Sequence, residues 1–337
     1  LSQRLNNEIL LKREDLQPVF SFKLRGAYNK LRQLSKAQLE AGVIAASAGN
    51  HAQGLALAAQ KMGVKATIVM PITTPKIKVD AVRGWGANVV LFGDNYDAAA
   101  GHANELIEQH GMTYIHRFDD PDIIAGQGTV GMEILRQLPG KLDAIFIAVG
   151  GGGLCAGVAA YVKYVRPGVK IIAVESDDAA CLDAAMKAGK RVRLKEVGIF
   201  ADGTAVAEVG KETFRILKDL VDEVITVSTD EICAAIKDVY NDTRAICEPS
   251  GAMGAAGLKK YVGDLRRMHA SVRVSGALAA HTRCTSAGPP DWTHAGRVAQ
   301  DMCRIGSTTR LAGHGAWRVQ RAGRRVLRRL RRARFGV

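Results

Sequence analysis

The sequence predicts an α/β fold of the doubly wound type, with mainly parallel sheets covered by helices on both faces. Short apolar runs alternate with helical segments up to about residue 263, an order typical of strand–helix units. The apolar runs are continuous rather than alternating with polar residues, which favours strands that are buried on both faces. Gly, Asp and Pro separate the segments, and no short-period repeat is present, which excludes a solenoid.

The elements follow from this alternation in chain order. A strand-like stretch near residue 9 leads to an amphipathic helix that opens near Lys23, with Ser21 as its expected cap. Further strands are expected at 43–47, 66–71, 88–93, 112–116, 143–150, 170–176 and 223–228. Helices are expected at about 51–62, 75–83, 96–110, 127–138 and 154–164, and after each of the last two strands.

Composition limits the class of protein. The 337 residues are 47% apolar, which is enough for two domains of ordinary size. No apolar run reaches the ~18 residues that span a bilayer. The six cysteines form no CxxC pair and no Cys/His cluster with metal-ligand spacing, so we predict no metal site and reduced thiols. We expect a cytoplasmic protein, and the abrupt start at Leu1 leaves room for an upstream targeting segment.

The net charge of +14 is concentrated in residues 264–337. That segment contains 16 Arg and three Asp but no Lys or Glu. A basic segment can bind nucleic acid. Its composition nevertheless differs so much from the preceding residues that we interpret it as an atypical Arg-rich tail of different origin, such as a frame-shifted or replaced terminus.

Two loops follow the carboxyl ends of expected strands, where open α/β sheets bind ligands. The loop at 47–54, with the sequence SAGNHAQG, enters a helix, so its N–H groups suit a carboxylate. The loop at 150–154 has four consecutive glycines before Leu154, which favours a phosphate cradle. The second loop also fits a dinucleotide fingerprint, with Glu175 as the ribose-binding acid, and the loop alone leaves both ligands open.

Lys23 lies just inside a helix start in the stretch QPVFSFKLRGAYNK. The partial positive charge of a helix N-terminus disfavours a protonated amine, and this would suit a nucleophilic lysine. A solvated surface lysine remains the alternative for this residue considered alone.

Four motifs together carry a resemblance: SFKLRGA, SAGNHAQG, VGGGGL and EPSGA, in this order and spacing. They resemble pyridoxal-phosphate enzymes of the tryptophan-synthase-β type. The stretch LLKREDLQPVFSFKLRGAYNK is more closely similar to the biosynthetic threonine dehydratases. The similarity covers about residues 1–262.

The resemblance implies two doubly wound domains with the cofactor cleft between them. Residues 1–44 and 121–263 would form the large cofactor-binding domain, 45–120 the inserted small domain, and 264–337 would lie outside the family match. A homo-oligomer, either a dimer or a tetramer, is expected, with an amino acid as the small-molecule substrate. Neither a membrane nor a nucleic acid is an expected partner.

The resemblance also implies roles for individual residues. Lys23 would form the Schiff base with pyridoxal 5'-phosphate and act as the catalytic residue. The cofactor-binding residues would be Phe22, Lys23, Asn50, Gly150, Gly151, Gly152, Gly153 and Leu154, with Ser275 a weak candidate for the pyridine nitrogen. The substrate carboxylate would be bound by Ser47, Gly49, Asn50 and His51.

The implied reaction is deamination of L-threonine to 2-oxobutanoate and ammonia, the first step of isoleucine biosynthesis, with L-serine as a secondary substrate. Alternatives that stay open are a serine dehydratase or racemase of the same fold and an inactive variant with an altered terminus. A nucleic-acid-binding protein that uses the arginines of 264–337 is the alternative from a different class.

Overall fold

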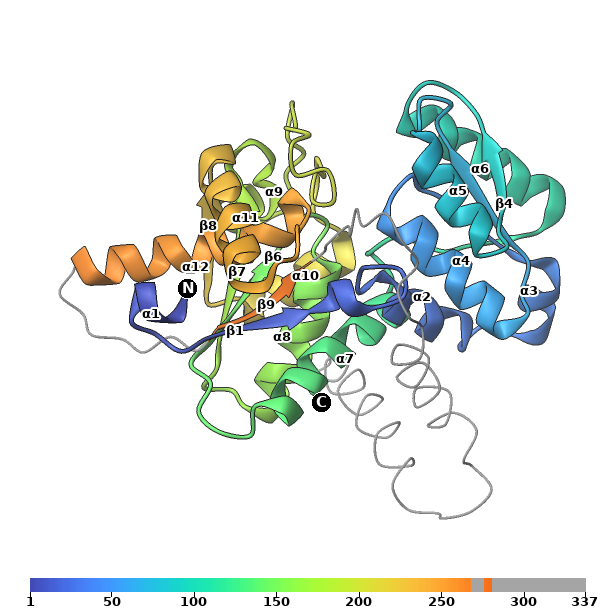
Figure 1. Cartoon of the computed structure of the whole chain (residues 1–337). Coiled ribbons are helices and arrows are strands. Elements are labelled where there is room, and N and C mark those ends of the chain that lie inside the picture. Colours follow the sequence, from blue (N-terminus) through green and yellow to red (C-terminus); the bar gives the residue numbers. More distant parts are fainter. Residues whose placement is uncertain (268–275, 281–337) are drawn as a thin grey trace, which may run out of the picture. The chain divides into compact units, whose positions relative to one another are not determined.

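The computed structural model describes residues 1–267 and 276–280, with side chains described for residues 1–263. Strands and helices alternate along the chain, and the strand pairs of the described residues are parallel (Figure 1). The predicted α/β class with parallel sheets is confirmed. No helix in the described part is long and apolar enough to cross a membrane.

The larger sheet has five strands in the order β1-β9-β6-β7-β8. Its strands are β1 (Ile9–Arg13), β9 (Gly276–Ala280), β6 (Ala144–Ala148), β7 (Lys170–Ser176) and β8 (Glu223–Val227). Along β6, Ile145 and Ile147 face one hydrophobic cluster, whereas Phe146 faces the other. Successive side chains of a strand point to opposite faces, so a fully apolar strand requires cover on both.

Helices provide this cover. One face packs against α7 (Pro121–Gln137), α8 (Gly153–Val165), α9 (Cys181–Ala188) and α10 (Lys211–Leu220). The other face packs against α11 (Thr229–Thr243) and α12 (Pro249–Arg267).

The smaller sheet has four strands in the order β4-β3-β2-β5. Its strands are β4 (Asn88–Leu91), β3 (Ala66–Met70), β2 (Val43–Ala46) and β5 (Thr113–Tyr114). On one face, a hydrophobic cluster joins side chains of this sheet to those of α2 (Lys23–Leu31), α4 (Asn50–Met62) and α5 (Lys76–Gly84). On the other face, a second hydrophobic cluster joins the sheet to α6 (Tyr96–His110). The short elements are α1 (Ser2–Leu5), η1 (Glu14–Leu16), α3 (Lys36–Ala41) and η2 (Asp177–Ala179).

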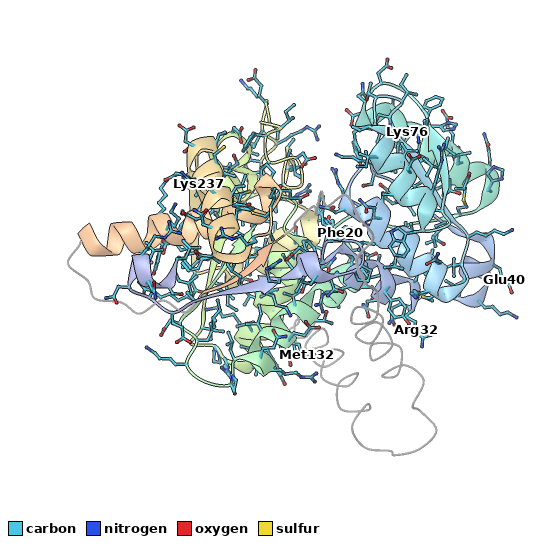
Figure 2. All side chains as sticks on the ribbon, in the orientation of Figure 1. Phe20, Arg32, Glu40, Lys76, Met132 and Lys237 are labelled. Carbon is cyan, nitrogen blue, oxygen red and sulfur yellow. The ribbon has the colours of Figure 1, made fainter. Side chains whose placement is uncertain are left out.

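The start of α2 differs from the prediction. The capping position is Phe22, which has helical dihedrals (φ −67°, ψ −12°), and no side chain caps this end. Ser21 is fully buried, and its Oγ has no hydrogen-bond partner. The expected cap at Ser21 was therefore wrong, because the chain enters the helix through a turn in which the Phe20 N–H donates to the Gln17 carbonyl. This turn leaves Phe20 40% exposed, with a φ of 54° (Figure 2).

Helix α7 begins at Pro121, earlier than the expected start near residue 127. The Asp120 carboxylate accepts hydrogen bonds from the N–H groups of Asp122 (2.8 Å) and Ile123 (3.2 Å), and proline occupies the first helical position. The stretch DDPD is therefore a helix cap rather than a break between elements.

Strand β9 lies within residues 264–337, the expected Arg-rich tail. Its backbone pairs with β1 over five residues and with β6 at Phe146. Residues 276–280 thus complete the larger sheet between two strands that are far apart in sequence, a contribution that the composition of this segment did not predict.

Candidate active site

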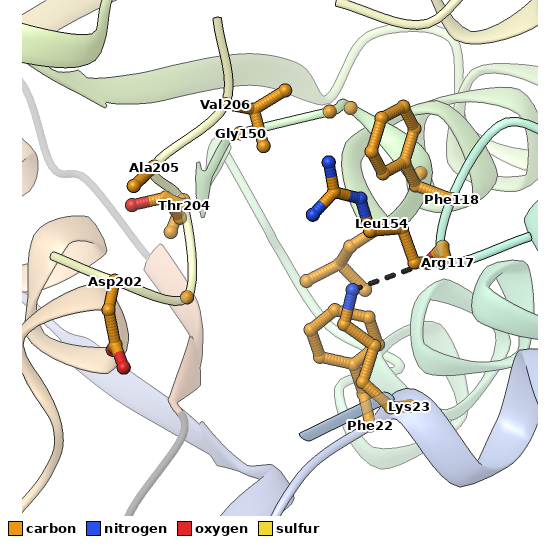
Figure 3. Close-up of a pocket in the computed structure, with 15 residues that line it drawn as sticks. Phe22, Lys23, Arg117, Phe118, Gly150, Leu154, Asp202, Thr204, Ala205 and Val206 are labelled. Carbon is orange, nitrogen blue, oxygen red and sulfur yellow. Dashed lines mark hydrogen bonds between the residues drawn. The ribbon is translucent and has the colours of Figure 1, made fainter. Parts of the chain in front are cut away.

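One pocket brings the start of α2 together with the glycine loop. Lys23 and Leu154 lie on one side of this pocket, and the loop that begins at Asp202 lies opposite (Figure 3). The lining residues are Phe22, Lys23, Arg117, Phe118, Ala148, Gly150, Gly151, Gly152, Gly153, Leu154, Asp202, Gly203, Thr204, Ala205 and Val206.

The amine of Lys23 is the central polar group of the pocket. Its Nζ donates to the Arg117 carbonyl oxygen at 3.4 Å and lies 5.2 Å from the centre of the Phe22 ring. Burial and the positive charge of Arg117 lower the pKa of Lys23 to about 8, although the carboxylate of Glu248 acts to raise it. A larger fraction of the amine is therefore unprotonated near neutral pH than in an ordinary lysine.

The glycine loop lies between β6 and α8. A Cβ at Gly150 would lie 2.6 Å from the Thr204 carbonyl oxygen, and Gly152 has a φ of +90°. Both positions therefore require glycine. Because α8 begins at Gly153, the N–H groups of its first turn have no acceptor within the helix. These donors suit an anionic group such as a phosphate, and the Lys23 amine in the same pocket suits an aldehyde, so the residues present fit pyridoxal phosphate.

The loop before α4 takes a different position from the glycine loop. Asn50 is the first residue of α4, and its Nδ2 donates to Glu248 Oε1 at 3.0 Å. The Gly49 N–H donates to Ser47 Oγ at 3.4 Å. His51 Nε2 lies 2.9 Å from the Ile115 carbonyl, and burial lowers the pKa of His51 to about 3. The neutral imidazole therefore donates from Nε2 to this carbonyl, which fixes the orientation of the ring.

The structure thus places some of the predicted site residues in the lining of this pocket and others at the start of α4. Phe22, Lys23 and the residues from Gly150 to Leu154 share the pocket, whereas Ser47, Gly49, Asn50 and His51 lie at the start of α4 and do not line it. Ser275 lies outside the described residues. Within the described residues no cluster of His, Cys, Asp or Glu is arranged to hold a metal.

Glu175 does not serve as the acid of a dinucleotide site. It is fully buried, and its carboxylate accepts hydrogen bonds from the N–H groups of Leu182 and Asp183, both at 2.8 Å. These N–H groups belong to the first turn of α9, so Glu175 binds a helix N-terminus. The dinucleotide interpretation of the glycine loop therefore loses the residue that would bind the ribose.

Several lining residues were not predicted from the sequence. Arg117 and Phe118 follow the carboxyl end of β5, a position where α/β sheets commonly place ligand-binding groups. Residues 202–206 form an irregular loop, so no periodicity marks them. Glu248, in the EPSGA motif, accepts a hydrogen bond from the distant Asn50, and its carboxylate acts to raise the pKa of Lys23.

Gly54 sets the position of the Lys23 backbone. A Cβ at Gly54 would lie 2.8 Å from the Leu24 nitrogen and 2.8 Å from the Lys23 carbonyl carbon. Because both obstructing atoms are backbone, Gly54→Ala is expected to push α2 away from α4 and to cost about 1–3 kcal/mol of unfolding free energy. Denaturant unfolding measures this loss, and the covalent attachment of added pyridoxal phosphate measures displacement of Lys23.

The matched control is Gly101→Ala, in the exposed middle of α6, where a Cβ meets nothing within 4 Å. That variant is expected to be neutral or to gain up to ~1 kcal/mol from helix propensity. Equal effects of the two substitutions would contradict the close-approach argument.

Comparisons with known proteins agree with this geometry. The family described as "Pyridoxal-phosphate dependent enzyme" matches residues 1–274, farther than the motifs alone indicated. A Burkholderia multivorans protein named L-threonine dehydratase biosynthetic IlvA is 59% identical over 264 residues, which cover 77% of this chain and 52% of that protein. The chain spans about half the length of the curated relatives it matches.

Two solved structures have the same fold. The processed form of threonine deaminase isoform 2 from Solanum lycopersicum has a TM-score of 0.81 and 48% identity, with 89% of this chain and 84% of that chain covered. Serine racemase from Dictyostelium discoideum has a TM-score of 0.77 and 35% identity, with 85% of this chain and 90% of that chain covered. With Lys23 and the glycine loop in one pocket and a family match over most of the chain, this protein belongs to the pyridoxal-phosphate dependent enzymes.

Proposed function

We propose that this chain carries the catalytic part of an ammonia-lyase that converts L-threonine to 2-oxobutanoate and ammonia, with L-serine as a secondary substrate. The observation that carries the proposal is the juxtaposition of the Lys23 amine with the glycine loop. Relatives named biosynthetic threonine dehydratase at 55–60% identity support the choice of threonine and a role in isoleucine biosynthesis.

Bound pyridoxal phosphate supplies an electron sink for the negative charge that develops at the substrate α-carbon. In this proposal Lys23 holds the cofactor covalently, and its free amine takes the α-proton when the substrate replaces it. A pKa of about 8 keeps this amine close to the ideal range for proton transfer near neutral pH. The N–H groups from Gly150 to Leu154 hold the phosphate, and Phe22 packs beside the ring.

The α4 start completes the proposed substrate site. Backbone N–H groups of the loop from Ser47 to His51 would hold the substrate carboxylate, because a helix N-terminus favours an anion. Asn50 would orient the cofactor ring through its 3-oxygen, and the contact of its amide with Glu248 fixes the rotamer for this role. Ser275 remains a weak candidate for the pyridine nitrogen.

The assembly and domain division are also proposals. The strands of the smaller sheet lie within residues 43–114, and those of the larger sheet lie outside this range. This division supports a small domain at 45–120 inserted into a large domain made of 1–44 and 121–263. A cytoplasmic homo-oligomer, dimer or tetramer, follows from the family resemblance. The nucleic-acid alternative depends on the arginines of residues 264–337, of which Arg266 and Arg267 alone fall within the described residues.

The deciding experiment measures 2-oxobutanoate formed from L-threonine by the purified full chain with added pyridoxal phosphate. We expect turnover of threonine and slower formation of pyruvate from L-serine. A protein that binds the cofactor but turns over neither amino acid would contradict the proposed activity while leaving the family assignment intact. Faster turnover of serine than of threonine would favour the serine dehydratase alternative.

Racemisation is expected to be a minor reaction. A racemase needs an acid on the substrate face opposite Lys23, and in racemases of this fold a serine precedes the glycine of the GNH loop. Here that residue is Ala48, whose methyl group cannot transfer a proton. A positioned acid or base contributes about 10²–10⁴-fold, so pyruvate should form from L-serine far faster than D-serine.

Chiral chromatography of the products tests this expectation. Ala48→Ser is the matched variant, and it should raise the ratio of D-serine to pyruvate because it restores a hydroxyl at this position. D-serine formed faster than pyruvate by the unaltered chain would overturn the elimination assignment in favour of a racemase.

A further inference from the structure

We infer that Arg117 binds the phosphate group of the cofactor and supplements the backbone N–H groups of the Gly150–Leu154 loop with a positively charged side chain. The inference rests on the proposed role of that loop in holding the phosphate. Arg117 lies between β5 and α7, and it lines the same pocket as Lys23 and the glycine loop. Figure 3 shows its guanidinium extending into the space bordered by Gly150, Leu154 and the Lys23 amine.

The backbone that carries Arg117 is fixed on both sides. His116 Nδ1 accepts hydrogen bonds from the N–H groups of Phe118 (3.1 Å) and Asp119 (2.7 Å), which closes a tight turn around Arg117. The Asp119 carboxylate in turn accepts from the N–H groups of Lys211 and Glu212 at the start of α10, both at 2.8 Å. The turn is thus attached to the helix that packs beside α8, so Arg117 is held in place before any ligand binds.

Aromatic rings support the Arg117 side chain. The guanidinium carbon lies 4.5 Å from the centre of the Tyr96 ring and 5.4 Å from that of the Phe118 ring. Phe118 also packs against the backbone of Gly151 and Gly153, where a Cβ would collide with it. The same aromatic side chain therefore contacts both the guanidinium and the glycine loop, which couples the positions of the two.

The positive charge of Arg117 favours the binding of an anion in the pocket. Among the described residues no carboxylate forms an ion pair with this guanidinium, whereas the guanidinium groups of Arg13, Arg25 and Arg215, which are also partly or fully buried, each pair with one. Its neighbour in the pocket is the Lys23 amine, whose pKa it lowers. Two cationic groups that share a pocket repel each other, and an anion bound between the guanidinium and the glycine N–H groups relieves this repulsion.

Phosphate is the anion that this arrangement favours. A guanidinium offers several N–H donors in a planar fork that matches phosphate oxygens, and its charge-assisted hydrogen bonds are stronger than those of neutral backbone donors. The substrate carboxylate is the second anion that enters such a site. The start of α4, where that carboxylate is expected, does not line the pocket, whereas the glycine loop does.

The test compares the dissociation constants of pyridoxal phosphate and pyridoxal for the apo full chain, measured by absorbance at one pH. The two molecules share the ring and the aldehyde, so the ratio of their dissociation constants isolates the phosphate. We expect Arg117→Gln to reduce the preference for the phosphorylated form by about tenfold to a hundredfold. Arg117→Lys keeps the positive charge and should retain part of the preference for the phosphorylated form. The control Arg32→Gln, at an exposed position, should retain all of this preference.

Each outcome decides the inference. An unchanged ratio in Arg117→Gln overturns it, whether that variant binds both molecules as well as the original chain does or its affinity for both falls by the same factor. An unchanged ratio with a raised KM for threonine assigns the guanidinium to the substrate carboxylate instead. Should Arg117→Gln not fold by circular dichroism, Arg117→Lys decides on its own: a preference equal to that of the original chain counts against a bidentate phosphate contact. A chain that prefers neither molecule before substitution contradicts the proposed role of the glycine loop itself.

Discussion

Replacing Lys23 with alanine is expected to reduce the proposed deamination of threonine by at least about 10²–10⁴-fold, because the variant loses the amine that we propose takes the α-proton. Covalent attachment of the cofactor should disappear as well, which borohydride reduction followed by peptide mapping detects. The fold should persist, since the pKa of Lys23 is lowered by burial and by Arg117, and the folded state gains little from a charged amine there.

The matched control is Lys163→Ala. Lys163 is partly buried on α8 and pairs with Asp222 at 2.6 Å, and it does not line the pocket. We expect its loss to leave the rate and the covalent attachment unchanged. A label on a different lysine after borohydride reduction, or full activity in Lys23→Ala, would show that the assigned residue is wrong.

The pH dependence provides a second test of Lys23. A protonated amine has no free electron pair, so the attachment of added pyridoxal phosphate to the apo protein should slow about tenfold per pH unit below a pKa of about 8. An ordinary solvated lysine would show the same decline below about 10.5. A profile with the higher midpoint would contradict the buried position of the amine beside Arg117.

Replacing Arg25 with methionine is expected to lower the unfolding free energy by about 3–5 kcal/mol, because it removes the guanidinium that pairs with the buried Glu14 and the partly buried Glu133. Arg25 is 6% exposed, and its Nε and Nη2 donate to the two Glu14 oxygens, both at 2.8 Å. Its Nη1 donates to Glu133 Oε1 at 2.7 Å. Arg25 thus joins η1, α7 and the first turn of α2, the turn that carries Lys23, so activity should fall together with stability.

Acid unfolding distinguishes this network from simple loss of packing. Burial acts to raise the pKa of Glu133, but hydrogen bonds from Arg25 lower it to about 2, below its ordinary value of 4.5. The contribution of Glu133 to stability is therefore present above pH 4.5 and is lost as the pH falls through about 2. In Arg25→Met this pH dependence should largely disappear, leaving the part that Lys12 supplies through its 2.6 Å contact with Glu133.

Arg215→Met is the control for the network. Arg215 pairs with Glu212 one turn away on α10, and both side chains are 28% exposed. A pair of this kind contributes about 0–1 kcal/mol, so denaturant unfolding of this variant should differ little from that of the original chain. Similar losses of unfolding free energy in Arg25→Met and Arg215→Met would show that burial does not increase the contribution of Arg25 to stability.

Local sequence patterns determined the strands and most helices. Helix α6 was predicted at 96–110, its observed bounds, and in the structure Asn95 caps its start and Gly111 adopts a left-handed conformation at its end. The continuous apolar run of β7 predicted a strand covered on both faces, which is what the sheet shows. Such signals lie within a few residues of the element they define, so they can be recognised without the rest of the chain.

Some local signals were outweighed by tertiary packing. Ser21 has the residue type of a helix cap, yet it is fully buried with no hydrogen bond because the turn before it fixes the direction of the chain. Glu175 follows the glycine loop at the sequence separation expected of a ribose-binding acid, yet its carboxylate caps α9. In both cases the residue type was compatible with two structures, and contacts with distant segments selected one of them.

For the candidate site, the sequence by itself determined the chemical groups: a lysine at a helix start and a loop of four glycines that follows a strand. Only the tertiary structure decided which side chains meet there. Arg117 is 94 residues from Lys23 in the sequence. They are in contact because the chain that follows β5 places Arg117 in the pocket, and because Gly54 allows α4 to pack closely against α2. Contacts of this range depend on how sheets and helices pack, and packing depends on the shapes of many side chains at once, which no short pattern encodes.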